Sequence, residues 1–175
     1  MFKLRVGWMA LLGLLWLPSM ALSAEYYLDI RKETVNITGK AMERVTVNHS
    51  LPAPTLYWTE GEDVVIHVTN HMDEPSSVHW HGILVPGYMD GVKDLNGYPG
   101  IEPGQTFTYR FTVRQSGTYW YHSHTNGQEQ DGLYGALIIR PKRDDPIKAD
   151  REAVVMFSDF SDETADDILG NLKMS

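Results

Sequence analysis

The chain has 175 residues, no cysteine, and 23 acidic against 15 basic side chains, which gives a formal net charge of −8. An acidic chain without a basic block is poorly suited to nucleic acid or to an anionic membrane surface, so we expect neither as a partner. The lack of cysteine excludes disulfide bonds and any thiolate metal ligand.

Residues 1–24 have the three-part pattern of a secretory signal peptide. Lys3 and Arg5 form a positive start, Val6 to Leu17 is almost unbroken apolar sequence, and small residues follow. The apolar core is too short to span a bilayer by itself, although a single N-terminal anchor helix is the alternative. We therefore expect cleavage near Ala24, export to the periplasm, and no membrane contact afterwards.

Short runs with strand-like alternation, separated by turn residues, fill the next part of the chain. These runs occupy residues 25–39, 43–58, 60–70, 103–124 and 132–141. The clearest one places Phe107, Tyr109 and Phe111 on one side of a strand. Pro52 and Pro54 favour a loop or an edge strand in their region. Many short strands and little helix predict an all-β domain, an antiparallel β-sandwich or Greek-key barrel.

The segments between and after these strands indicate how the chain is divided into domains and linkers. Residues 87–104 are rich in Gly and Pro and predict a long loop, a kind that is usually functional or mobile. After the charged residues 141–152, residues 153–162 have the pattern of a new strand and residues 163–175 that of a helix. We therefore predict a signal peptide over residues 1–24, one domain over 25–141, and over 142–175 a linker with the start of a following, truncated domain.

Four of the seven histidines form two His-x-His units, His79 with His81 and His122 with His124. On a strand, residues i and i+2 point to the same side, so each unit would present two neighbouring imidazoles. Imidazoles without a nearby carboxylate or thiolate suit copper or zinc better than magnesium or calcium. The alternative is ordinary surface or core histidines with satisfied hydrogen bonds. That alternative is preferred for the three remaining histidines, which are His49, His67 and His71.

The sequences around both units resemble a known family. "SSVHWHGILVPGYMDGV" and "GTYWYHSHTNGQEQDGLYGALIIRP" resemble the first two copper-binding motifs of the multicopper oxidases, the laccase and ascorbate oxidase family. The wider context, over residues 26–141, looks like the first cupredoxin domain of the bacterial periplasmic copper-resistance branch. The resemblance implies a cupredoxin-like Greek-key fold.

The resemblance also implies roles for the four histidines. His79 is similar to a ligand of the type 2 copper, His81 and His122 to ligands of one type 3 copper, and His124 to a ligand of the other. In this family a C-terminal cupredoxin domain supplies the other histidines and the type 1 copper, which needs a cysteine. This chain has no cysteine, and therefore no type 1 site.

Other residues of the two motifs have weaker implied roles. Asp90 falls where the family places an acid that assists proton delivery during oxygen reduction, although an Asp-Gly pair is equally suited to a plain turn. Trp80 and Ser123, between the paired histidines, should point away from the metal and pack into the sheet. Gln128 and Asp131 could orient ligand imidazoles, although exposed loop residues are the preferred interpretation.

The leading functional hypothesis is a copper-binding domain of a multicopper oxidase. Such a domain would supply half of the trinuclear-cluster histidines for reduction of oxygen to water, coupled to oxidation of Cu(I) or phenols in copper resistance. Without a type 1 site, the isolated chain should be inactive as an oxidase. The alternatives are a stand-alone periplasmic module that sequesters or delivers copper, with zinc as another possible ion, and a partner domain with vestigial histidines.

Overall fold

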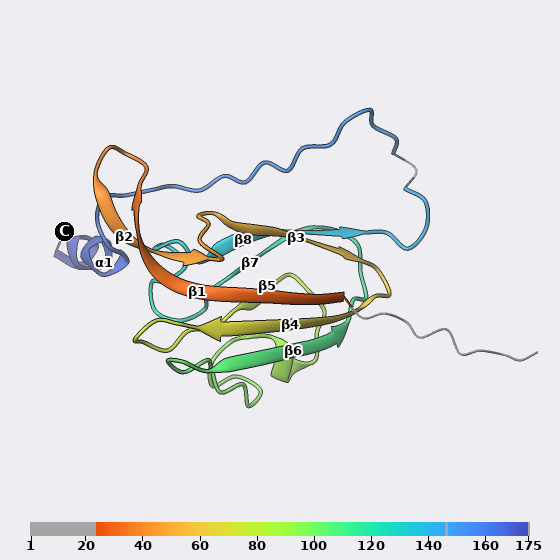
Figure 1. Ribbon diagram of the computed structural model, residues 1–175, viewed down its shortest axis with the longest axis horizontal. Helices are drawn as coiled ribbons and strands as arrows, with labels where there is room; N and C mark the ends of the chain where they lie inside the picture. Colours follow the sequence, from red (N-terminus) through yellow and green to blue (C-terminus); the bar gives the residue numbers. More distant parts are fainter. Residues whose placement is uncertain (1–23, 146, 175) are drawn as a thin grey trace, which may run out of the picture.

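The computed structural model describes residues 24–145 and 147–174, so the predicted signal peptide lies outside the described residues except for Ala24. Eight strands form two four-stranded sheets (Figure 1). The first sheet contains, in spatial order, β2 (Ala41–Val47), β1 (Ala24–Asn36), β4 (Asp63–Asn70) and β6 (Thr106–Thr112). The second contains β3 (Ala53–Thr59), β8 (Tyr134–Arg140), β7 (Gly117–His122) and β5 (His79–His81). Within the described residues, no helix is long and apolar enough to cross a membrane.

Both sheets are mixed, which corrects the expectation of an antiparallel sandwich. β1 runs parallel to β4, and β3 runs parallel to β8, whereas the other neighbouring pairs are antiparallel. Alternation of apolar and polar residues identifies a strand and its buried face, but it does not identify the neighbouring strand. The parallel pairs join strands that are distant in sequence, and no local pattern encodes such pairing.

One hydrophobic core lies between the sheets, and the alternation in the sequence explains which side chains enter it. Val64, Ile66 and Val68 of β4 are buried on one face, as are Tyr109 and Phe111 of β6. Burial of each such large side chain stabilises the fold by about 1.5–3 kcal/mol. Pro54 lies in β3, which is an edge strand, as the sequence predicted.

The centre of this core is aromatic. The fully buried ring of Trp80 lies 5.3 Å from Trp58, 5.2 Å from Tyr109 and 5.9 Å from Tyr121, measured between ring centroids. These neighbours come from three different strands, β3, β6 and β7. The packing therefore anchors β5, a strand of only three residues that pairs with β7 alone.

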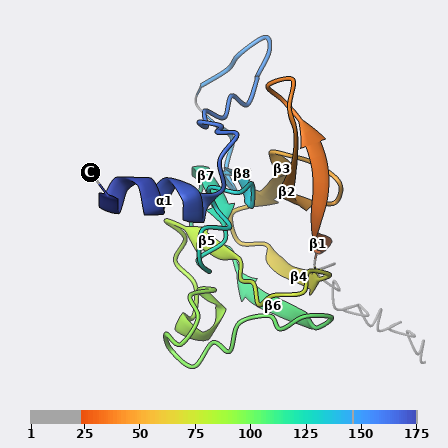
Figure 2. The ribbon, with the colours of Figure 1, turned by 90° about the vertical axis from the view of Figure 1, so that its left-hand side faces the viewer.

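The chain after β8 forms no strand in its described residues, so the predicted strand over residues 153–162 is wrong. This segment returns along the molecule in extended form, and α1 (Ala165–Met174) follows it, as the helical pattern predicted (Figures 1 and 2). The apolar side chain of Phe157 is 92% exposed. The alternation is present, but among the described residues no neighbouring strand satisfies the backbone of this segment.

Arg44 fastens the end of this segment to the sandwich. Arg44 as a whole is only 3% exposed, and its guanidinium donates hydrogen bonds to the carbonyl oxygens of Ser161 at 2.5 Å and Glu163 at 3.0 Å. It also lies over the ring of Phe160, 5.2 Å from the centroid. A buried cation with these acceptors holds residues 160–163 against β2.

The Arg44→Met variant should therefore lose stability. Its aliphatic side chain would keep much of the packing but leave the two carbonyl groups without a donor, which costs about 1–3 kcal/mol. The matched control is Arg140→Met, because the Arg140 side chain is 62% exposed and lies 3.8 Å from Glu152. The control should change stability by no more than about 0.5 kcal/mol. Denaturant unfolding measures both, and equal losses would contradict the anchoring role of Arg44.

Candidate metal centre

The pairing of β5 with β7 brings the two His-x-His units together. In the antiparallel register His79 lies opposite His122, Trp80 opposite Tyr121, and His81 opposite Trp120. Trp80 is buried in the core, so His79 and His81 project from the other face of β5, as the sequence predicted. Because His79 and His122 are cross-strand partners, His122 projects from that same face.

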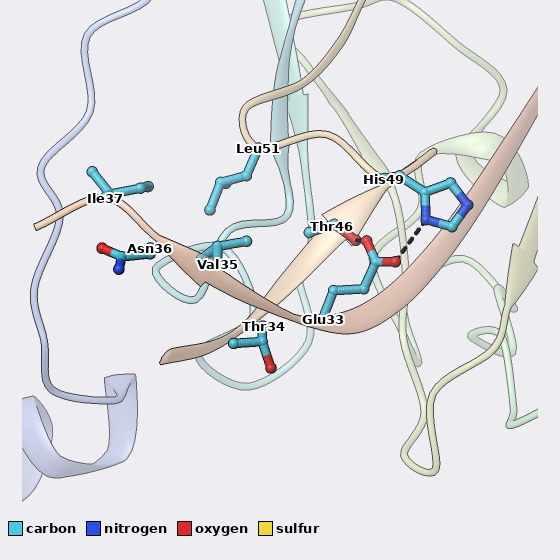
Figure 3. Close-up of a pocket in the computed structure, with 8 residues that line it drawn as sticks. All are labelled: Glu33, Thr34, Val35, Asn36, Ile37, Thr46, His49 and Leu51. Atoms are coloured by element: carbon cyan, nitrogen blue, oxygen red, sulfur yellow. Dashed lines mark hydrogen bonds and ion pairs between the residues drawn. The ribbon is translucent and has the colours of Figure 1, made fainter. Parts of the chain in front are cut away.

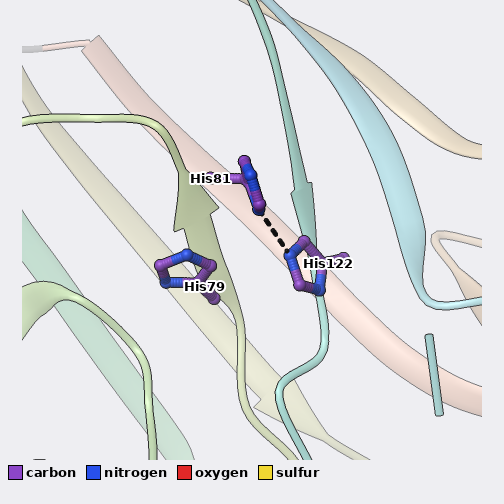
Figure 4. Close-up of side chains that lie close together, drawn as sticks. All are labelled: His79, His81 and His122. Carbon is purple, nitrogen blue, oxygen red and sulfur yellow. Dashed lines mark hydrogen bonds between the residues drawn. The ribbon is translucent and has the colours of Figure 1, made fainter. Parts of the chain in front are cut away.

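Three histidines converge on one point (Figure 4). His79, His81 and His122 each offer a ring nitrogen, and these nitrogens lie within 4.8 Å of one another. Nδ1 of His81 lies 3.1 Å from Nε2 of His122. Two imidazole nitrogens that bind one ion at about 2.0–2.1 Å lie no more than about 4.2 Å apart, so these two fit a shared metal ion.

His124 lies beside this cluster rather than within it. β7 ends at His122, so His124 stands in the following loop, and the expectation of a strand pair is wrong for the second unit. The His124 ring is 5.8 Å from His79 and 6.3 Å from His122 between centroids. Its backbone N–H donates to Ser77 Oγ at 3.0 Å, which holds the loop against the start of the first motif. Ser123 is buried, as predicted.

Hydrogen bonds behind the cluster determine which ring nitrogens face it. His79 Nδ1 lies 2.7 Å from the backbone oxygen of Asp90, and His122 Nδ1 lies 2.8 Å from that of Ser123. A carbonyl oxygen only accepts, so both Nδ1 atoms carry the proton and both Nε2 atoms keep a free electron pair. Burial lowers the pKa of His122, which favours the neutral, metal-binding form.

Sequence reasoning missed one residue that touches the cluster. Glu129 Oε2 lies 2.7 Å from His122 Nδ1. By contrast, neither Gln128 nor Asp131 bonds an imidazole among the described residues. Gln128 is buried, which corrects the preferred interpretation of an exposed loop residue, and its side-chain oxygen accepts from the Ser123 hydroxyl at 2.9 Å. Asp131 instead accepts from the Ala165 N–H at 3.1 Å, where α1 begins.

Asp90 contacts the cluster through its backbone. It follows a short 3₁₀ helix, η1 (Gly87–Met89), and its carboxylate Oδ1 is 3.6 Å from His79 Nδ1, too far for a hydrogen bond. Gly91 fixes this approach, because its φ is +81° and a Cβ there would lie 1.8 Å from the Val78 oxygen. The loop therefore packs directly on β5, which brings the Asp90 carbonyl against His79.

The three remaining histidines lie elsewhere and have ordinary partners, as expected. His67 Nδ1 is 3.0 Å from Thr108 Oγ1, and His71 Nε2 is 3.1 Å from Asp29 Oδ1. His49 Nδ1 is 2.6 Å from Glu33 Oε1 in a cavity of about 650 Å³ on the outer side of the β1–β2 pair (Figure 3). Of the described residues, none of these three joins a group of metal-ligand type.

The Gly91→Ala variant should displace the loop from β5 and remove the Asp90–His79 hydrogen bond. The added methyl group meets backbone atoms that cannot move aside cheaply, so we expect a loss of stability about 1–3 kcal/mol larger than in the control. The control is Gly104→Ala, where φ is also positive at +73° but no atom lies within 4 Å. Denaturant unfolding of both variants checks this, and equal losses would show that the close approach at Gly91 is unimportant.

Residues 29–144 match the multicopper oxidase family. "Copper resistance protein A" of Escherichia coli is 48% identical over 149 residues, covering 85% of this chain and 24% of that protein. The protein of the same name from Pseudomonas syringae pv. tomato is 46% identical, covering 89% and 25%. The chain thus spans about a quarter of the length of these curated relatives.

Solved structures confirm the expected cupredoxin-like fold. A blue copper oxidase from Nitrosomonas europaea superimposes with a TM-score of 0.65 at 38% identity, over 70% of this chain and 40% of that one. Fet3p, a multicopper oxidase that functions in iron import, gives 0.66 at 36% identity, over 75% and 25%. With residues 29–144 matched and three histidines gathered at the paired motifs, the chain belongs to the multicopper oxidase family.

Proposed function

We propose that this chain is the domain of a multicopper oxidase that supplies half of the histidines of a trinuclear copper cluster. The observation that carries the proposal is the convergence of His79, His81 and His122 on one face of the β5–β7 pair. The ligand nitrogens are Nε2 of His79, Nδ1 of His81 and Nε2 of His122. His124, beside them, is the fourth ligand and completes the set drawn from the two motifs.

The chemistry of these donors supports copper. All four are imidazoles, which bind copper well, and no cluster ligand is a carboxylate of the kind that magnesium and calcium prefer. Copper held there would supply the redox chemistry for the reduction of oxygen to water. The protein's own part is to orient the imidazoles, through the Asp90 and Ser123 carbonyl groups, and to keep His122 neutral by burial. The Asp90 carboxylate, beside His79, is the proposed proton donor.

The remaining ligands and the entry point for electrons are assigned to a second cupredoxin domain, C-terminal in the complete enzyme. A type 1 copper needs a thiolate ligand, and this chain has no cysteine. Its similarity to "Copper resistance protein A" supports a role in copper resistance. The proposed oxidised substrates are Cu(I) or phenols. The signal-like residues 1–24 support export to the periplasm.

Copper affinity tests the ligand set. Cu(II) binding by the 175-residue chain, measured by competition with a chelator of known affinity, should weaken by at least about 100-fold in His81→Ala, because a direct ligand contributes more than the outer partners, whose loss costs about 10–100-fold. His67→Ala is the control, since His67 bonds Thr108 in the other sheet. Equal weakening in both variants would place the copper site elsewhere.

Oxygen consumption tests whether the chain needs a second domain with a type 1 copper for oxidase activity. The copper-loaded chain alone should not oxidise a phenol with oxygen, because no type 1 site passes electrons to the cluster. Robust turnover by the chain alone would contradict the proposal. Tight copper binding by a complete, stand-alone product that never assembles with another cupredoxin domain would favour the alternative, a module for copper sequestration or delivery.

A further inference from the structure

We propose that Glu129 is a positioning residue for the metal centre, which holds His122 with Nε2 directed into the cluster and increases the electron density that this nitrogen offers. The proposal rests on the proposed copper function for its consequence, but its geometric part concerns only the metal-free chain.

The contact between Glu129 and His122 is not forced by packing. The Glu129 side chain is 47% exposed, yet its Oε2 lies 2.7 Å from Nδ1 of a His122 side chain that is only 6% exposed. No Lys or Arg of the described chain pairs with Glu129, so the protonated Nδ1 edge of His122 is the polar group closest to its carboxylate among the ion-pair contacts. The attraction between this N–H group and the carboxylate favours the observed position of the half-exposed side chain.

Glu129 acts on His122 together with two other contacts of the imidazole. Trp120 stacks on the imidazole with centroids 4.2 Å apart and planes 21° apart, which fixes the plane of the ring. Stacking does not distinguish between a ring and the same ring turned over by 180°. Acceptors at Nδ1 do make that distinction, because the turned ring would place a C–H group against them. The Ser123 carbonyl accepts the Nδ1–H hydrogen bond, and the Glu129 carboxylate places negative charge 2.7 Å from the same nitrogen, which favours the same orientation of the ring.

The charge on Glu129 distinguishes His122 from the other two cluster histidines. His79 has a neutral carbonyl behind it at 2.7 Å, and the Asp90 carboxylate is too far away to accept a hydrogen bond. In the described chain, the His81 imidazole hydrogen-bonds only His122. A carboxylate beside the outer nitrogen of a ligand imidazole raises the basicity of the inner nitrogen. His122 is therefore the strongest donor of the three.

Glu129 also lies between the cluster and a cavity of about 400 Å³. Trp120 and Glu129 line this cavity on the side of the cluster, and Met156, Phe157 and Asp159 of the post-β8 segment line it elsewhere. The carboxylate is thus reachable from outside, whereas the imidazole that it holds is buried. This position explains how a residue in an exposed loop acts on a buried ligand.

The test uses three variants of the 175-residue chain. Glu129→Ala removes the carboxylate group, and Glu129→Gln keeps its shape but removes the charge. Glu33→Gln is the matched control, since Glu33 contacts His49 Nδ1 at 2.6 Å in the same kind of pair, outside the cluster (Figure 3). ¹⁵N NMR of the metal-free chain reports the protonated nitrogen of each histidine, and chelator competition reports the affinity for Cu(II).

We expect a single Nδ1–H form of His122 in the original chain and in Glu33→Gln. In Glu129→Ala the Ser123 carbonyl alone favours the Nδ1–H form, so this variant should show a detectable share of the Nε2–H form of His122 and a copper affinity lower by about 10–100-fold. Glu129→Gln should retain the Nδ1–H form with an intermediate affinity. An unchanged His122 spectrum in Glu129→Ala would overturn the proposal, as would equal copper affinities of Glu129→Ala and Glu33→Gln. Failure of the original chain to bind copper would instead overturn the proposed function, while the NMR result would still decide the role of Glu129.

Discussion

The geometry of the histidine cluster depends on the burial of one indole ring. Trp80 packs among Trp58, Tyr109 and Tyr121, and it is the middle residue of a strand only three residues long. Removal of a fully buried Trp from a core costs about 3–5 kcal/mol, far more than the strand could regain in another register. Since neighbouring residues on a strand point in opposite directions, the indole in the core forces both adjacent imidazoles to the other face. The hydrophobic core therefore sets the direction of the ligands.

The direction of a histidine side chain is not sufficient for metal binding, because the nitrogen that faces the metal must carry an electron pair and not a proton. The loops determine which nitrogen carries the proton. The Asp90 carbonyl comes from the long loop after β5, and the Ser123 carbonyl comes from the end of β7. Both accept from Nδ1, so the electron pairs of the Nε2 atoms face inward. The strands β5 and β7 set the positions of the imidazole rings. The segments that follow these strands determine which nitrogen of each ring carries the proton.

The sequence alone was sufficient for features that depend on local periodicity. It predicted most strands of the sandwich, the loop or edge position of Pro54 and the inward direction of Trp80. It also predicted that the two His-x-His units converge, and three of the four histidines, His79, His81 and His122, do so. These follow from the two-residue repeat of a strand and from the resemblance of the two motifs to a family.

Features that depend on the local course of the backbone were predicted poorly. The second motif looks like a strand pair, but the ladder ends at His122, and His124 enters a loop. Glu129 and Gln128 are adjacent polar residues in that loop, yet one contacts a ligand and the other is buried beneath Ser123. Composition cannot separate them, because turns rather than alternation decide where each side chain points. The parallel strand pairs escaped prediction because such neighbours are chosen by contacts far apart in sequence.

The loop that carries His124 and Glu129 is also tied to the segment after the sandwich. Asp131 accepts from the first N–H of α1, and the Ala165 side chain fills the space that a side chain at position 127 would occupy. The loop and the start of α1 are therefore packed and hydrogen-bonded together, although more than thirty residues separate Asp131 from Ala165. A displacement of the start of α1 would break this hydrogen bond or displace the loop with it. The position of the helix is thus coupled to that of the loop, which begins directly after His122.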